Sequence, residues 1–113
     1  MKNALQTLCA VCRAHAGPNG YGFRGKRHVW ACSDPKCISL LPKVYDMPNT
    51  TLDAYEEKAI AEGGDAAGAY LDEVGVYNLI ELRPPQWEEF CKRLVVGSQK
   101  ALQRMIEQNE APF

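Results

Sequence analysis

Cys-Ala-Val-Cys at residues 9–12 and Cys-Ser-Asp-Pro-Lys-Cys at residues 32–37 decide the fold of this chain. Structural zinc takes four soft ligands at the corners of a tetrahedron, and each short-spaced cysteine pair can supply two of them. We therefore predict one structural Zn²⁺ whose ligands are Cys9, Cys12, Cys32 and Cys37. Four thiolates leave no open coordination position, so this metal would stabilise the fold rather than catalyse a reaction.

Two histidines give alternative ligand sets, because His15 or His28 could replace one cysteine. A surface or strand position is the simpler interpretation of each. A redox pair is the alternative for the first two cysteines, but such pairs normally begin a helix in a βαβ setting, which is lacking here. Neither histidine belongs to the H-x-E motif of zinc deaminases. We predict no catalytic residues and no enzymatic activity.

The segments around the cysteines predict a treble-clef-type finger. Residues 21–23 and 28–31 have the alternation of a short β-hairpin, with a turn near 24–26. Ser33 or Asp34 would cap a short helix with Pro35 in its first turn, so that Cys37 faces back toward the metal. Pro42 is expected to end or kink this helix. A zinc ribbon, with a further hairpin in place of the helix, is the alternative.

The rest of the chain predicts a helical hairpin. One helical pattern starts at Thr50, taken as its N-cap, and ends at Gly75; Gly63-Gly64 leaves open whether it is one helix or two. The last helix is expected from about Pro85 to Asn109. The predicted fold is thus small α+β, a treble-clef-type finger followed by a mainly α-helical hairpin. We expect residues 1–46 and 47–113 to pack together as one compact unit.

The charge is divided unevenly, although the net charge is only −1. Residues 1–45 carry about +6 and residues 46–113 about −7, and zinc with four thiolates would lower the first value to about +4. No stretch approaches the roughly 20 apolar residues of a membrane span. The first residues lack the pattern of a secretory signal, so we expect a cytoplasmic protein in which paired cysteines bind metal.

The helical part contains two short signatures, Gly-Ala-Tyr-Leu-Asp-Glu-Val-Gly at 68–75 and Pro-Pro-Gln-Trp-Glu-Glu-Phe at 84–90. Their residues Tyr70, Leu71, Gly75, Trp87 and Phe90 carry a resemblance to small, largely uncharacterised proteins of tailed phages and prophages that have an N-terminal Cys-rich finger. It implies a phage or mobile-element accessory protein in the host cytoplasm, and no established activity.

We expect the protein to act by binding a partner through its charged surfaces. The finger interleaves aromatic residues with five cations that could contact nucleic acid or an acidic protein surface. These cations are Arg13, Arg24, Lys26, Arg27 and Lys36. The alternative is an inhibitor that binds a host protein complex, in the manner of an anti-CRISPR, through its acidic helices. We expect neither a membrane partner nor a small-molecule substrate.

Overall fold

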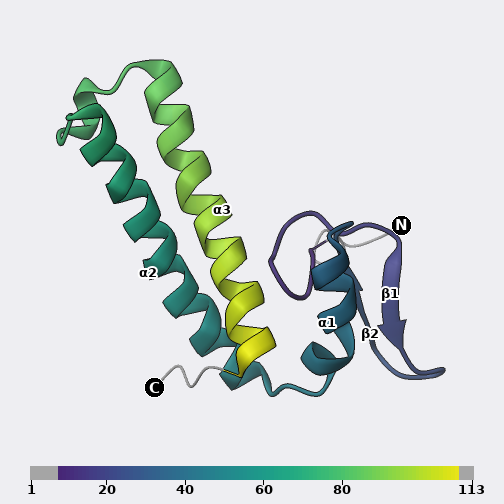
Figure 1. Ribbon diagram of the computed structural model, residues 1–113. Helices are drawn as coiled ribbons and strands as arrows, with labels where there is room; N and C mark the ends of the chain where they lie inside the picture. The colour runs from purple at the N-terminus through teal and green to yellow at the C-terminus, as the bar shows by residue number, and fades with distance from the viewer. Residues whose placement is uncertain (1–7, 110–113) are drawn as a thin grey trace.

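The computed structural model describes residues 8–109, which form a two-stranded hairpin and three α-helices. The elements follow in the order β1 (Asn19–Gly22), β2 (His28–Ala31), α1 (Pro35–Tyr45), α2 (Asn49–Val74), the 3-10 turn η2 (Leu79–Glu81) and α3 (Pro84–Gln108). Figure 1 shows α2 and α3 as a long antiparallel pair, with the finger packed against one half of it. The predicted small α+β fold is confirmed.

The finger has the order of elements expected for a treble clef. The strands β1 and β2 pair antiparallel, with Tyr21 opposite Val29. The turn between them places Gly25 at φ +77°, a left-handed conformation that glycine adopts without a steric penalty. A helix follows the hairpin, which excludes the zinc-ribbon alternative.

The start of α1 is as predicted, and of the two effects expected of Pro42 the structure excludes the first, an end of the helix. Asp34 is the N-cap, and its Oδ1 accepts a hydrogen bond from the Lys36 backbone N–H at 2.9 Å. Pro42 does not end the helix, which continues to Tyr45. The buried Leu41 and Val44 flank this proline, so their packing holds the last turn in place of the backbone hydrogen bond that proline cannot donate.

The segment around the two glycines forms one continuous helix, α2, which ends at Gly75 in the left-handed conformation. The predicted N-cap is wrong: α2 begins at Asn49 after Pro48, without a side-chain cap, so Thr50 lies inside the first turn. The last helix matches its predicted range closely.

One apolar core joins the finger to the helical hairpin. It combines the cysteine segment, the inner face of α1, the first half of α2 and the last turns of α3. Its most enclosed side chains include Val11, Ala59, Met105 and Ile106. The far half of the helical hairpin extends beyond this core, which gives a molecule 53 Å long and 22 Å thick (Figure 1). Within residues 8–109, no helix combines the length and apolar character that a membrane span needs.

Candidate metal centre

The four cysteines selected by their spacing converge on one point. The Sγ atoms of Cys9, Cys12, Cys32 and Cys37 all lie within 4.8 Å of one another. The Sγ atoms of Cys12 and Cys32 are 3.8 Å apart. A tetrahedral zinc with Zn–S bonds of about 2.3 Å has sulfur–sulfur edges of about 3.8 Å, so this pair is already at the spacing that a metal requires.

A tight turn and the junction between β2 and α1 bring these cysteines together. The first pair lies on a tight turn in which the Cys9 N–H donates to the Ala14 carbonyl at 2.7 Å, and Arg13 adopts a left-handed φ of 69°. The Ala10 N–H donates to the Trp30 carbonyl at 2.8 Å, which attaches this turn to β2. The second pair spans the end of β2 and the first turn of α1.

The thiols perturb one another strongly. A hydrogen bond with Cys12 is the main cause that lowers the pKa of Cys9 to about 4, and the same contact raises the pKa of Cys12. Burial is the largest cause that raises the pKa of Cys37 to about 12. Four clustered thiolates, three of them buried, would repel one another without a compensating cation, so a divalent metal would displace protons on binding.

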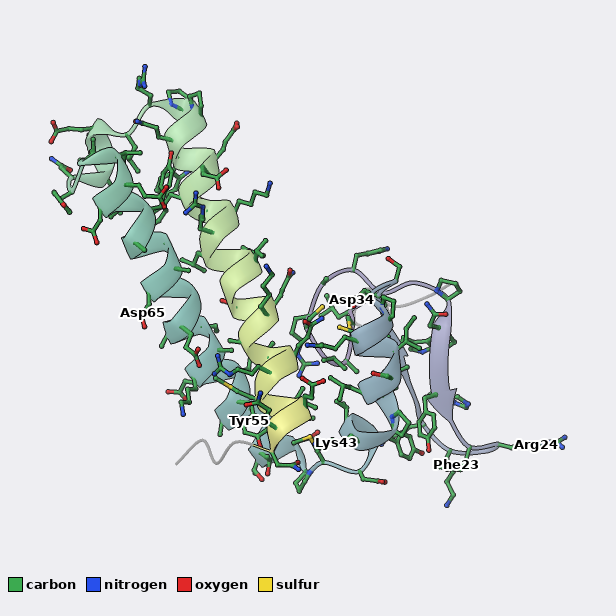
Figure 2. The ribbon with its side chains drawn as sticks, in the orientation of Figure 1. Phe23, Arg24, Asp34, Lys43, Tyr55 and Asp65 are labelled. Carbon is green, nitrogen blue, oxygen red and sulfur yellow. The ribbon has the colours of Figure 1, made fainter. Side chains whose placement is uncertain are left out.

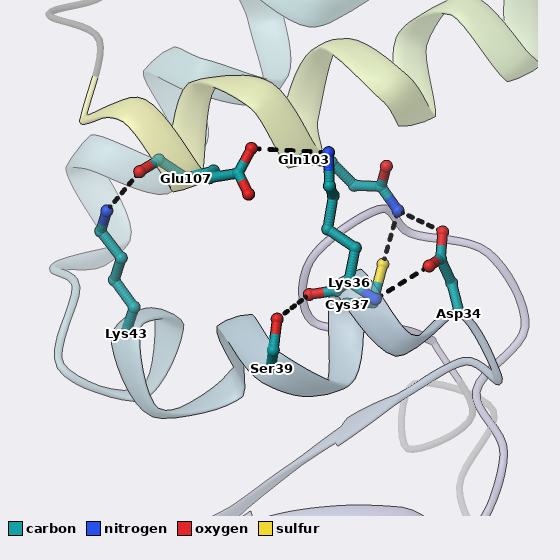
Figure 3. A network of polar contacts seen from close by, with 7 residues as sticks. All are labelled: Asp34, Lys36, Cys37, Ser39, Lys43, Gln103 and Glu107. Carbon is teal, nitrogen blue, oxygen red and sulfur yellow. Dashed lines mark hydrogen bonds and ion pairs between the residues drawn. The ribbon is translucent and has the colours of Figure 1, made fainter.

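A residue of α3 reaches into this cluster, as Figure 3 shows. The Nε2 of Gln103 donates to Cys37 Sγ at 3.0 Å and to Asp34 Oδ2 at 2.7 Å. An amide has two N–H groups, so it can serve both acceptors, and a donor beside a ligating sulfur belongs to the outer shell of a metal site. No local pattern points to Gln103, which lies 66 positions after Cys37.

Neither histidine takes part in the cluster. Within residues 8–109 the only group of three or more potential metal ligands consists of the four cysteines. His15 and His28 are exposed elsewhere on the finger, and Cys91 is half-buried on α3. This donor set suits metals that accept tetrahedral sulfur coordination, and it fits a metal that holds the fold.

The five cations predicted to form a binding face divide into two groups. Arg13 and Lys36 lie against the helical hairpin, where Arg13 Nε is 2.7 Å from Glu56 and Lys36 Nζ is 3.5 Å from Glu107. Lys43 of α1 also donates to the Glu107 backbone carbonyl at 2.9 Å. Part of the charge division along the sequence therefore serves the contact between the finger and the helices.

The other three cations lie between β1 and β2, at the tip of the β-hairpin, which we define as residues 21–28; Figure 2 labels Phe23 and Arg24 there. Arg27 donates to the Tyr45 carbonyl at 2.6 Å and lies over the Tyr45 ring, whereas Arg24 and Lys26 form no side-chain ion pair with any described residue. Phe23 is 55% exposed and packs edge-on against Tyr21 and Tyr45. The tip thus combines free positive charge with an accessible ring.

Comparisons with protein-family models, curated proteins and solved structures found no match to this chain.

Proposed function

We propose that this chain is a non-enzymatic zinc protein that binds nucleic acid through the tip of its β-hairpin. Zinc is the metal that the four clustered thiolates suit best, because it undergoes no redox chemistry and is stable in a closed tetrahedral sulfur site. A metal with four protein ligands has no position for a substrate. The metal would therefore fix the hairpin, and the hairpin would carry the function.

One observation carries the proposal: the hairpin tip that exposes Phe23 also carries Arg24, Lys26 and Arg27, while Arg13 and Lys36 contact acids of the helices. Cations attract phosphates, and an exposed ring can stack on an unpaired base. The rigid support of the ring by Tyr21 and Tyr45 favours such stacking because little side-chain freedom remains to be lost. Single-stranded DNA or RNA is the class of ligand that can contact both the cations and the exposed ring.

Fluorescence anisotropy with labelled single-stranded DNA, RNA and duplex DNA, each at low and high salt, tests the proposal. We expect the zinc-loaded protein to bind the single strands with an affinity that falls as salt rises. The double variant Arg24→Gln/Lys26→Gln should reduce the slope of log K against log salt by about 1.4, because each lost phosphate contact removes about 0.7. Phe23→Ala should weaken single-strand binding by about 1–3 kcal/mol.

A matched pair on the helical hairpin, Lys58→Gln/Lys92→Gln, removes the same charge from exposed positions far from the tip. It should leave the salt slope nearly unchanged. The proposal fails if the folded, zinc-loaded protein binds none of the three probes, or if the matched pair lowers the slope as much as the tip pair. The resemblance to phage and prophage proteins implies a mobile-element setting, and the binding experiment does not depend on it.

A further inference from the structure

The closed end of the helical hairpin, residues 70–90, exposes an unusual amount of apolar side chain. Half of the large apolar side chains exposed within residues 8–109 lie here. They are Ile80, 92% exposed, Tyr77, 70%, Trp87, 47%, and Leu79, 43%. A connection between two antiparallel helices can be built from a few polar residues, so the fold itself does not require these side chains.

The backbone that presents these side chains is held by hydrogen bonds. Asn78 Oδ1 accepts from the Ile80 N–H at 3.2 Å, and the Glu81 and Leu82 N–H groups donate to the carbonyls of Asn78 and Leu79. The turn η2 therefore fixes the direction of Ile80 even though water surrounds its side chain. A preformed apolar projection loses little conformational entropy on binding.

The helices beneath this turn are fixed to each other as well. Arg93 of α3 contacts Glu73 of α2 at 2.7 Å and Glu89 at 2.8 Å, and its guanidinium lies 4.9 Å from the centroid of the Tyr70 ring. Hydrogen bonds to the two carboxylates raise the pKa of Arg93 further above its usual range. The closed end is thus a rigid platform, which projects away from the finger in Figure 1.

Exposed carboxylates dominate the charge around the apolar side chains. Asp72, Glu81 and Glu88 are exposed and form no ion pair in the described part of the chain, whereas the exposed cations nearby are Arg83 and, one helical turn after Glu88, Lys92. Negative charge opposes the approach of nucleic acid and of anionic lipid. It favours a surface that presents lysine or arginine beside apolar groups.

We propose that the closed end docks a basic, apolar segment of a partner protein, with Ile80, Leu79 and Trp87 as anchors and Asp72, Glu81 and Glu88 as the charged rim. This surface lies apart from the hairpin tip and uses the opposite charge, so it goes beyond the proposed nucleic-acid binding. The two surfaces together would make the chain an adaptor.

A synthetic amphipathic helix with a lysine polar face and a leucine apolar face is the probe, and the same peptide with glutamate in place of lysine is its counterpart. We expect calorimetry to show saturable binding of the lysine peptide alone, with an affinity that falls as salt rises. Leu79→Ser/Ile80→Ser should weaken binding about tenfold or more, the change expected when aliphatic anchors lose their burial. Glu81→Gln/Glu88→Gln should weaken binding and reduce its salt dependence.

Matched variants distinguish binding at this site from non-specific binding of the peptide. Ile60→Ser removes a 55% exposed apolar side chain from α2 outside the closed end, and Glu57→Gln removes an exposed carboxylate there. Both should bind the lysine peptide as the wild type does. Equal binding of the two peptides, or equal losses in the matched variants, would overturn the proposal. Two other results would also overturn the proposal by assigning the surface another occupant. One is concentration-dependent dimerisation that Leu79→Ser/Ile80→Ser abolishes, and the other is binding to vesicles of anionic lipid that the same variant abolishes.

Discussion

Two adjacent glycines in α2 should respond in opposite ways to the same substitution. Gly63 is buried where α3 crosses α2, and a Cβ there would overlap Ser98 Oγ and the Leu94 carbonyl oxygen. Gly64 is exposed, and a Cβ there would meet nothing within 4 Å. Both residues are helical, so the gain in helix propensity on replacement by alanine is the same, about 1 kcal/mol.

The difference between the two sites is the cost of steric overlap. The Leu94 carbonyl is backbone and cannot rotate away, so Gly63→Ala must push the two helices apart at this contact. Overpacking costs about 1–3 kcal/mol, and the overlap with immobile backbone puts Gly63→Ala in the upper part of this range, above the gain in propensity. We expect Gly63→Ala to lower the free energy of unfolding by about 1–2 kcal/mol, and Gly64→Ala to raise it by up to about 1 kcal/mol.

Urea unfolding of zinc-loaded protein, followed by far-ultraviolet circular dichroism, measures both values. The melting temperatures should also separate, with Gly63→Ala lower by roughly 5 °C. Ser98→Ala in the Gly63→Ala background should recover only part of the loss, because the Leu94 carbonyl still obstructs the new methyl group. The packing described for α2 and α3 is refuted if Gly63→Ala is as stable as Gly64→Ala.

Three further substitutions test individual contacts. Gln103→Met should keep the side-chain volume, remove the donor to Cys37, and speed zinc release to a chromogenic chelator; an unchanged release rate would show that this hydrogen bond does not support the metal site. Glu62→Gln removes the ion pair with Arg104 and should cost at most about 1 kcal/mol of stability at neutral pH, because solvent screens this half-exposed pair. A hydrogen bond from Arg104 lowers the pKa of Glu62, so this stabilisation is fully present above the ordinary pKa of a glutamate, and the wild type should lose its advantage as the pH falls through the lowered pKa, which urea titrations at several pH values would check. Gly25→Ala should destabilise the finger by roughly 1 kcal/mol because it forces a side chain into the left-handed region, whereas equal stability in zinc-saturated buffer would argue against the described turn.

Local sequence signals predicted most of the finger, because each of its features is set by residues close together in the chain. The cysteine spacing selected the four ligands, and Asp34 with Pro35 marked the start of α1. The same local reasoning expected Pro42 to end α1 or kink it, and it did not foresee three further helical residues held by buried Leu41 and Val44.

Contacts between distant residues could not be predicted in this way. Gly63 is tolerated in α2 because α3 packs over it, and nothing near Gly63 in the sequence reports that contact. The same holds for Gln103 at the metal cluster and for the pairing of Arg13 with Glu56. The charge division was visible in the sequence, but its partial use inside the molecule became clear only from the fold.

The metal content of purified protein tests the central claim most directly. Elemental analysis combined with native mass spectrometry should find one zinc per chain, bound by the four clustered thiolates. Cys32→Ser should lose zinc and the ordered finger, whereas Cys91→Ser, at the half-buried cysteine outside the cluster, should retain both. A folded wild-type protein that contains no zinc under zinc-replete conditions, or a Cys32→Ser variant that retains the full complement, would contradict the proposed zinc centre.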